Sequence, residues 1–508
     1  MTTSLPATDT LTRDALAVLQ PGFTGTSAPS WLLRQLDEGL ASVGLFGRNI
    51  DSPEQLAVLT EQLREARPDV LVAIDEEGGD VTRLEARTGS SFPGNLALGH
   101  IDDPDLTRAV AHELGRRLAQ AGVTLNWAPS ADVNTNPDNP VIGVRSFGGD
   151  PKLVARHTVA YVEGMQAAGV AACVKHFPGH GDTAVDSHLA VPRIDADLET
   201  LRRRELVPFR AAIEAGCKCV MSAHILLPAL DAARPGTLSR AALTGLLRAP
   251  VSEGGLGHTG LVVTDGMEMQ AISATYGLER GSVLAIAAGA DAICVGGGLA
   301  GQDTVLRLRD TLVQAVRDGE LDRERLADAA DRVRALAAWT HEARRSGTGE
   351  LTDPALRPDP GIGLEAARRA LVVTGLERYR RPRGPLFVAA FTPLANIAVG
   401  DETPWGPAAE LERMVPGTRT ASFGSTDGDA AARVLDAAEG RPVVAVVRDM
   451  HRHPWMAQAV DRLIAARPDT VVVEMGVPQS APRGALHLAT HGAARVCGRA
   501  AAEVIARG

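Results

Sequence analysis

The segment GLVVTDGMEMQAI, residues 260–272, contains the pattern on which the fold prediction depends. A short run of apolar and β-branched residues is followed by a single carboxylate, Asp265, and then by Gly266 and a stretch with helical character. A continuous apolar run of this length is typical of a strand that is buried on both faces of a parallel sheet. The segment therefore predicts a buried strand that ends in a polar group and leads into a helix.

Seven similar runs lie before and after this segment, separated by Ala-, Leu- and Arg-rich stretches with helical periodicity, such as residues 53–66 and 105–122. This alternation of strand and helix predicts an α/β fold with a parallel sheet. Eight such units in about 340 residues predict a TIM-like (β/α)8 barrel with insertions. A doubly wound open sheet is the alternative. The expected strands are residues 16–20, 43–47, 70–75, 124–130, 171–176, 219–224, 261–265 and 292–296.

A second, smaller domain is expected after the barrel. The helical pattern of residues 321–344 closes the first domain, and the Gly- and Pro-rich stretch that follows is typical of a linker. We expect a catalytic barrel over residues 1–345, a linker over 346–364 and a C-terminal α/β three-layer sandwich over 365–508. The strands expected in the sandwich are residues 370–375, 385–391, 442–449 and 470–476.

The composition limits the classes of partner. A net charge of −10 over 508 residues argues against nucleic acid or an anionic membrane, because both require a basic surface. The apolar stretch 282–301 is interrupted by Asp291 and is not a membrane span. The five cysteines are expected to be buried free thiols, and the N-terminus shows no secretion signal, so a cytoplasmic location is expected. The oligomeric state stays open, with a monomer as one option.

Polar residues are placed where the expected strands end. In a (β/α)8 barrel the carboxyl ends of the strands form the face that carries the active site. Charged and imidazole side chains at strand after strand therefore indicate an enzyme. These residues are Arg48, Asn49, Asp75, Glu76, Glu77, Asp132, Lys175, His176, His224 and Asp265.

The segment KHFPGHGDTAVDSHLAVP, residues 175–192, holds three histidines and two prolines. Pro178, Gly179 and Gly181 exclude a regular helix, so a loop that carries function is expected. A metal site built from the histidines is an alternative, but their spacing fits no usual set of ligands. We therefore expect no metal.

The segment KHFPGHGDTAVDSH resembles the signature loop of the β-N-acetylglucosaminidases of glycoside hydrolase family 3. Other segments resemble the family in the same order along the chain, and together they cover most of both domains. The resemblance implies an exo-acting, retaining glycosidase that releases terminal GlcNAc from a small glycan and uses no cofactor. The other segments are GLFGRNIDSPEQLAVLT, AIDEEGGDVTRL, LNWAPSADVNTNPDNPVIGVRSFGGDP, TLSRAALTGLLR, LVVTDGMEMQAI and HGAARVCGRAAAEVIA.

The resemblance also implies which residues carry the chemistry. A retaining glycosidase needs a nucleophile and an acid/base on opposite faces of the sugar. The family's nucleophile corresponds to Asp265, for which a helix N-cap is the alternative. The family's acid/base is a His–Asp dyad, which corresponds to His188 and Asp186. Their spacing of two residues on an extended loop lets both side chains point the same way.

Five further residues are implied as substrate-binding groups: Asp75, Arg83, Arg145, Lys175 and His176. Asp75 is expected to accept charge-assisted hydrogen bonds from sugar hydroxyls. A structural ion pair is the alternative for Arg83. The family often has an arginine after the paired glycines, whereas this chain has Asp80, which puts one secondary contact in doubt.

Two alternative functions stay open. One is a phosphorylase that resolves the glycosyl-enzyme with phosphate and yields GlcNAc-1-phosphate. The other, from a different class, is a non-catalytic sugar-binding barrel. A β-glucosidase is less consistent with the His–Asp loop. The natural substrate, either muropeptide fragments of the cell wall or chitooligosaccharides, also stays open.

Overall fold

The computed structural model describes residues 9–183, 191–297, 301–346, 356–393, 403–426 and 428–507. They form two compact units. The first contains Met1–Glu76, Thr107–Val133 and Asp150–Pro358, and the second contains Glu77–Leu106, Asn134–Gly149 and Asp359–Gly508. Two segments from the first third of the chain thus belong to the same unit as the C-terminal region. The domain limits predicted around a linker at 346–364 stay a prediction.

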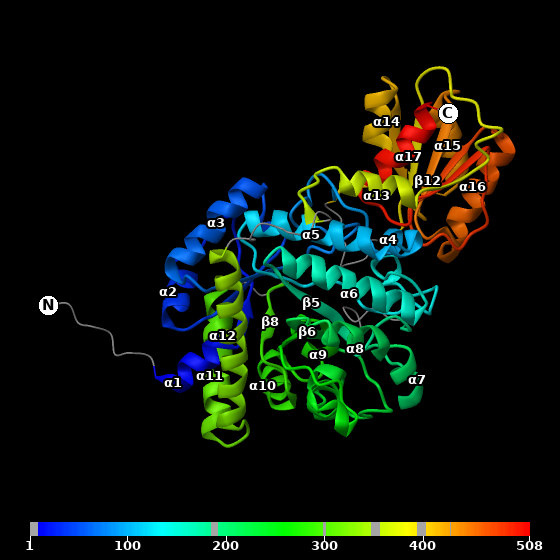
Figure 1. Ribbon diagram of the computed structural model, residues 1–508. Coiled ribbons are helices and arrows are strands. Elements are labelled where there is room, and N and C mark those ends of the chain that lie inside the picture. Colours follow the sequence, from blue (N-terminus) through cyan, green and yellow to red (C-terminus); the bar gives the residue numbers. More distant parts are fainter. Residues whose placement is uncertain are drawn as a thin grey trace. The chain divides into compact units, whose positions relative to one another are not determined.

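The first unit is a barrel of eight parallel strands, as predicted (Figure 1). Strands β2 to β7 pair in sequential order, so the sheet has no switch point and the doubly wound alternative is wrong. The strands are β1 (Leu19–Pro21), β2 (Ser42–Leu45), β3 (Leu71–Ile74), β4 (Leu125–Asn126), β5 (Ala171–Phe177), β6 (Cys219–Ser222), β7 (Leu261–Thr264) and β8 (Ile293–Val295).

Strands β8 and β1 close the barrel. Strand β8 pairs in parallel with β1, and a parallel bridge between Val263 and Ala292 joins it to β7. The hydroxyl of Ser42 in β2 donates a hydrogen bond to the carbonyl of Leu19 in β1 at 3.1 Å. Trp127 is buried, and a Cβ on Gly44 would lie 2.9 Å from its ring, so glycine is required there.

Helices cover the outside of the barrel, and their limits follow from capping and periodicity. In α3 (Pro53–Ala66), the hydroxyl of Ser52 accepts the Gln55 amide at the N-cap, and the helix buries one apolar face. The other helices are α1 (Thr10–Ala17), α2 (Ser30–Glu38), α5 (Pro104–Gln120), α6 (Pro151–Ala167), α7 (Leu198–Arg203), α8 (Leu206–Glu214), a π-helix (Ala241–Arg248), α9 (Gln270–Ser273), α10 (Leu278–Ala288), α11 (Gln302–Arg317) and α12 (Arg323–Arg345).

Two strand predictions in the barrel were wrong in extent. The run at 16–20 was expected to be a strand, but helix α1, which Asp9 caps at its start by accepting the Thr12 amide, extends to Ala17, and the strand begins only at Leu19. The strand expected at 124–130 is limited to two residues, and the chain turns at the cis peptide bond between Ala128 and Pro129.

The second unit contains the predicted three-layer sandwich. Its sheet has the order β11-β10-β12-β13-β14-β9, in which only β9 is antiparallel. Alternate residues of the central strands face two apolar cores, one packed against α13, α14 and α17 and the other against α15 and α16 (Figure 1). The elements are α4 (Asn95–Ile101), α13 (Ile362–Ala370), β9 (Val372–Thr374), β10 (Phe387–Phe391), α14 (Ala408–Met414), β11 (Arg419–Phe423), α15 (Ala430–Ala438), β12 (Val443–Val447), α16 (Pro454–Ala466), β13 (Val471–Glu474), β14 (Leu486–Ala489) and α17 (Arg495–Arg507).

Two strands of the sandwich, β11 and β14, were not predicted. Strand β11 lies at an edge of the sheet and is largely exposed, so it has no continuous apolar run. Strand β14 is short and is interrupted by His487. Neither has the sequence pattern of a buried strand.

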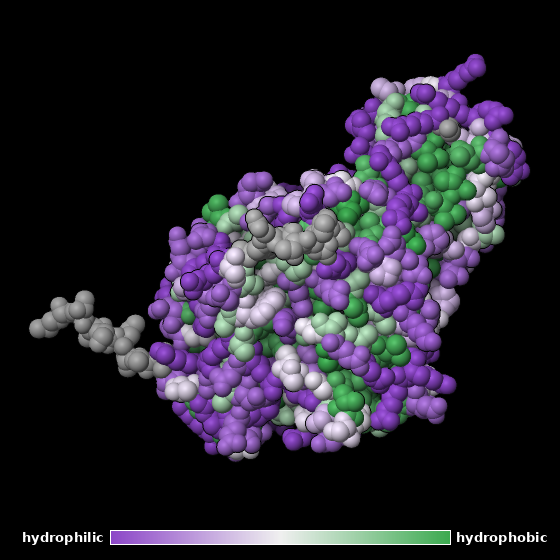
Figure 2. All heavy atoms as spheres, in the orientation of Figure 1, coloured by the Kyte–Doolittle hydropathy of each residue, from purple (hydrophilic) through white to green (hydrophobic). Residues whose placement is uncertain are grey.

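The surface and the cysteines fit a globular protein. Hydrophilic residues dominate the visible surface of α11 and α12 (Figure 2). All five cysteines are buried and free, as predicted. Among the described residues, no helix is both long and apolar enough to cross a membrane.

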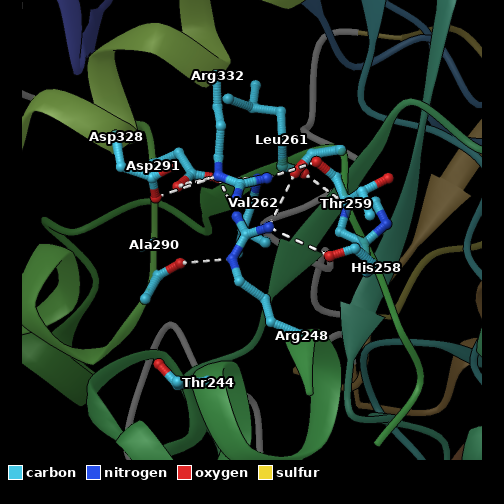
Figure 3. Close-up of polar contacts among 12 residues, drawn as sticks. Thr244, Arg248, His258, Thr259, Leu261, Val262, Ala290, Asp291, Asp328 and Arg332 are labelled. Atoms are coloured by element: carbon cyan, nitrogen blue, oxygen red, sulfur yellow. Dashed lines mark hydrogen bonds and ion pairs between the residues drawn. The ribbon is translucent and has the colours of Figure 1, made fainter. Parts of the chain in front are cut away.

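Buried polar residues join β7 and β8 at the ends of the strands opposite to Asp265 (Figure 3). The carboxylate of Asp291 is fully buried, pairs with Arg248 and Arg325, and accepts the Val262 amide at 2.8 Å. Arg248 also donates to the carbonyl of His258 at 3.3 Å. These contacts fix the start of β7.

His258 makes the stability of the barrel depend on pH. Burial lowers its pKa to about 4, while the unfolded chain titrates near 6.5. The unfolded state therefore binds a proton more readily between these values, and stability is lost as pH falls from about 6.5 to 4. The full effect is about 3 kcal/mol. We expect His258→Gln to reduce the loss of unfolding free energy over this range by about that amount, measured by denaturant titration. An equal acid loss in both proteins would contradict this role.

Candidate active site

An ion pair joins the ends of two barrel strands. Asp75 follows β3 and Lys175 lies near the end of β5, and the Lys175 Nζ lies 2.5 Å from Asp75 Oδ1. The lysine side chain is 2% exposed and the aspartate side chain 25% exposed. The aspartate side chain is therefore partly open to solvent, and the charge of the buried lysine is compensated.

A second acid–base pair joins the end of β5 to the segment after β4. The Nδ1 of His176 lies 2.7 Å from Asp132 Oδ2, and the amide of His180 donates to Asp132 Oδ1 at 2.6 Å. Burial opposes ionisation of Asp132, but the charges and hydrogen bonds of the two histidines outweigh it and hold its pKa well below the usual range. Burial lowers the pKa of His180 to about 4, although the charge of Asp132 opposes this.

Asp265 directly follows β7, as predicted. Its amide donates to the Ser222 carbonyl at 3.0 Å, and its Oδ1 accepts the Gly266 amide at 2.8 Å. His224 is fully buried and lies within hydrogen-bonding distance of the Gly266 carbonyl, at 3.0 Å, and of Thr237 Oγ1, at 2.9 Å. The backbone around the carboxylate is thus held on both sides, which suits a group that must attack one defined atom.

Several of these groups act electrostatically on the same neighbours, which indicates that they lie close together within the first unit. The charge of Asp265 acts on His180. Burial raises the pKa of the Cys294 thiol, and the charges of Glu268, Asp265 and Asp75 raise it further. A carboxylate at a strand end, with an ammonium group and imidazoles at neighbouring strand ends, is an arrangement for covalent and acid–base catalysis.

The two residues predicted as the acid/base lie outside the described residues. Asp186 and His188 belong to the segment 184–190. Up to Thr183 the preceding chain is described: His180 Nδ1 lies 2.6 Å from Thr183 Oγ1, and Arg204 pairs with Asp182 at 2.6 Å. The roles of Asp186 and His188 stay predictions.

The two predicted arginines belong to the second unit. Arg145 forms a bidentate ion pair with Glu77, at 2.7 and 3.0 Å, in which both side chains are buried. Arg83 lies in the segment 77–106 and is partly exposed. Of the five residues predicted to bind substrate, the first unit brings together Asp75, Lys175 and His176.

Asp80, which departs from the family pattern, has a structural role in the second unit. Its carboxylate pairs with Arg448 and accepts the Ala493 amide at 2.6 Å. Arg448 directly follows β12, so this pair ties the segment 77–106 to the sandwich. No pattern in the sequence connects these distant positions.

Sequence reasoning also missed two supporting carboxylates in the barrel. Glu268 accepts the amides of Gly296 and Gly297 and thereby holds the glycine turn after β8. Glu205 is buried beside Gly179 and pairs with Arg204. Burial raises the pKa of Glu205 to about 7, although Arg204 lowers it. Neither residue lies at a strand end, so no pattern marked them.

Among the described residues, no three histidine, cysteine, aspartate or glutamate side chains are placed to hold a metal ion. The site in the first unit contains carboxylates, a lysine and imidazoles at or near the carboxyl ends of barrel strands. These groups lie on the face of the barrel that carries active sites, and a carboxylate nucleophile with an acid/base is what glycoside hydrolysis requires.

Comparison of the sequence with models of known families identifies the family. The model of the glycosyl hydrolase family 3 N-terminal domain matches residues 28–336, which is more than half of the chain. The chain belongs to glycosyl hydrolase family 3.

Individual relatives agree with this assignment. The chain is 34% identical over 411 residues to β-hexosaminidase A of Pseudoalteromonas piscicida, a match that covers 76% of this chain and 63% of that protein. It is 38% identical over 260 residues to a β-hexosaminidase of Alkalilimnicola ehrlichii, covering 50% of this chain and 73% of the relative. A solved family 3 β-N-acetylglucosaminidase from Paenibacillus sp. str. FPU-7 has 33% identity and a TM-score of 0.85, over 98% of this chain and 97% of that one.

Proposed function

We propose that this chain is an exo-acting, retaining β-N-acetylglucosaminidase that releases terminal GlcNAc from small glycans. The observation that carries the proposal is the carboxylate of Asp265 at the end of β7, in one unit with the Lys175–Asp75 pair. The activities for which the β-hexosaminidase relatives and the Paenibacillus enzyme are named support the same function.

In the first step, Asp265 attacks the anomeric carbon. A bond forms between the carboxylate oxygen and this carbon, and the glycosidic carbon–oxygen bond breaks. His188 donates a proton to the departing oxygen, and Asp186 holds the imidazole in its protonated form. The products are a glycosyl-enzyme, the released alcohol and a neutral imidazole.

In the second step, the same imidazole acts as the base. It takes a proton from water while the water oxygen bonds to the anomeric carbon and the ester bond to Asp265 breaks. Two displacements at one carbon restore the β configuration of the released GlcNAc. An imidazole suits both steps because its pKa lies near neutral pH.

The sugar itself is bound by groups that do not react. We propose that Asp75 accepts hydrogen bonds from two sugar hydroxyls, and that Lys175 and His176 form hydrogen bonds with others. Arg83 and Arg145 are proposed as further donors. Because Lys175 already compensates the charge of Asp75, the pair is ready to bind a neutral sugar without a large change in local charge.

The substrate is proposed to be a small glycan, and muropeptide fragments of the cell wall and chitooligosaccharides are the two candidates. A cytoplasmic location would favour imported or recycled fragments over polymeric wall. Both candidates carry a terminal β-linked GlcNAc, so the preference has to be measured as kcat/KM on each.

Product analysis tests the reaction type. With an aryl β-GlcNAc we expect free GlcNAc as the main product, and little change in rate or product when millimolar phosphate is added. A His base would not repel a phosphate dianion as a carboxylate base would, since two like charges about 4 Å apart repel by several kcal/mol at intermediate dielectric. Formation of GlcNAc-1-phosphate as the main product would therefore contradict the hydrolase and favour the phosphorylase. No turnover of any β-GlcNAc would favour the non-catalytic alternative.

A further inference from the structure

The carboxylate of Asp132 is fully buried, and its histidine partners hold its pKa well below the usual range, yet the mechanism above gives it no role. It lies on the segment after β4 and accepts hydrogen bonds from Ser130, His176 and His180. Removing a carboxylate from water is costly unless its hydrogen bonds compensate for the loss. The arrangement of those bonds therefore indicates what the carboxylate does.

The two oxygens of Asp132 have different partners. Oδ1 accepts backbone amides, from His176 at 3.3 Å and from His180 at 2.6 Å. Oδ2 accepts from side chains, from His176 Nδ1 at 2.7 Å and from the Ser130 hydroxyl at 2.9 Å. One oxygen thus fixes the backbone of a turn, and the other fixes an imidazole.

The contact with Oδ2 determines how His176 is protonated. An ionised carboxylate only accepts hydrogen bonds, so the proton of the imidazole must reside on Nδ1. In that arrangement Nε2 of the neutral ring is an acceptor, and Nε2 of the charged ring is a donor. The side chain of His176 is only 7% exposed, so its orientation is also fixed by packing.

The contact with Oδ1 determines where the following loop begins. The Gly179 amide donates to the His176 carbonyl at 2.8 Å, and His180 is joined to Thr183 through Nδ1 at 2.6 Å. His180 is only 2% exposed, so this turn is held in the interior. The segment that contains Asp186 and His188 follows directly after Thr183.

We propose that Asp132 is a positioning residue with two separable effects: Oδ2 sets the proton position of His176 for sugar binding, and Oδ1 anchors the start of the loop that carries Asp186 and His188. The inference rests on the proposed function, because both effects act through residues assigned there. Asp132 itself does not touch the reacting atoms in this scheme.

Asp132→Asn separates the two effects. The amide oxygen of asparagine can still accept the two backbone amides, so the turn is kept. Its NH2 group then faces His176 Nδ1, which has to accept, and the imidazole proton moves to Nε2. We expect KM for an aryl β-GlcNAc to rise by about 10- to 100-fold, the effect of one charge-assisted hydrogen bond, with a much smaller change in kcat.

Asp132→Ala removes both effects. In addition to the rise in KM, we expect kcat to fall for substrates with poor leaving groups and to change little for those with good ones. This is the pattern of a displaced acid/base, with a limit of about 10²–10⁴-fold. A double-mutant cycle should show that Asp132→Asn adds little to KM once His176 is replaced by alanine, because the introduced amide group then has no imidazole to orient.

A matched control variant distinguishes a positioning role of Asp132 from a role in protein stability. Asp291 is also fully buried, but it lies at the opposite end of the barrel strands. Asp291→Asn should lower the melting temperature without changing KM. In every variant, titration with a mechanism-based fluorosugar gives the fraction of active enzyme, so that kcat refers to folded protein.

Two results would overturn the proposal. One is an unchanged KM in Asp132→Asn together with a fall in melting temperature like that of the control. The other comes from long-range ¹H–¹⁵N spectra of protein with ¹⁵N-labelled histidine, with the signals assigned through His176→Ala: a ring proton still on Nδ1 of His176 in Asp132→Asn. The spectra do not require turnover, and wild-type turnover is measured separately, so a failure of the proposed function is distinguished from a failure of this inference.

Discussion

Replacing Asp265 with glycine is expected to lower kcat on aryl β-GlcNAc by about 10⁵-fold, on the scale of losing a covalent nucleophile. The backbone amide of Asp265 donates to the Ser222 carbonyl, and this contact does not involve the carboxylate, so we expect the strand end to stay in place and the loss to reflect missing chemistry. Sodium azide should restore turnover by entering the space left by the side chain, and the product should be the α-glycosyl azide.

The wild-type enzyme provides the complementary experiment. A mechanism-based fluorosugar should add its mass to the tryptic peptide of residues 249–280, which contains Asp265. Fragment ions that divide the peptide on either side of Asp265 distinguish it from Glu268, the neighbouring carboxylate. An adduct on Glu268, or on any other peptide, would contradict the assignment.

Replacing His188 with alanine is expected to have the second largest effect. For substrates with poor leaving groups kcat should fall by about 10²–10⁴-fold, because the departing oxygen then leaves without a proton. Dinitrophenyl β-GlcNAc needs no protonation, so its first step should be little changed. The slope of log kcat/KM against leaving-group pKa should therefore become much steeper than in the wild type.

The pair His176–Asp132 offers a sharp comparison for this experiment. It is also an imidazole bonded to a carboxylate, and it lies at a strand end in the described part of the barrel. If His176→Ala, and not His188→Ala, steepened the leaving-group dependence, the acid/base would be the buried pair. Equal losses on all substrates in His188→Ala would instead indicate a structural role for that residue.

The barrel and its polar strand ends could be predicted because buried parallel strands require continuous apolar runs. The run before Asp265 was expected at 261–265 and is a strand over Leu261–Thr264. A polar residue that ends such a run is expected at the end of the strand, and Asp75 and Asp265 directly follow their strands, while Lys175 lies near the end of β5. The local sequence pattern alone was enough to predict where these residues lie.

Contacts between distant segments could not be predicted in this way. Asp132 and His176 are separated by 44 positions, and their contact depends on how β4 and β5 lie side by side. Likewise, no local pattern indicates that the segments with Arg83 and Arg145 belong to the same compact unit as the sandwich. Pairing, packing and register decide such contacts, and a single sequence shows none of them directly.

The stereochemistry of the first product tests the central claim most directly. The two-step mechanism with Asp265 as nucleophile requires net retention, whereas a single displacement by water would invert the anomeric carbon. Proton NMR spectra recorded within the first minutes of hydrolysis of an aryl β-GlcNAc, before mutarotation, distinguish the two anomers of GlcNAc. We predict that the β anomer appears first and that the α anomer grows in only later. Initial formation of the α anomer would contradict the covalent mechanism.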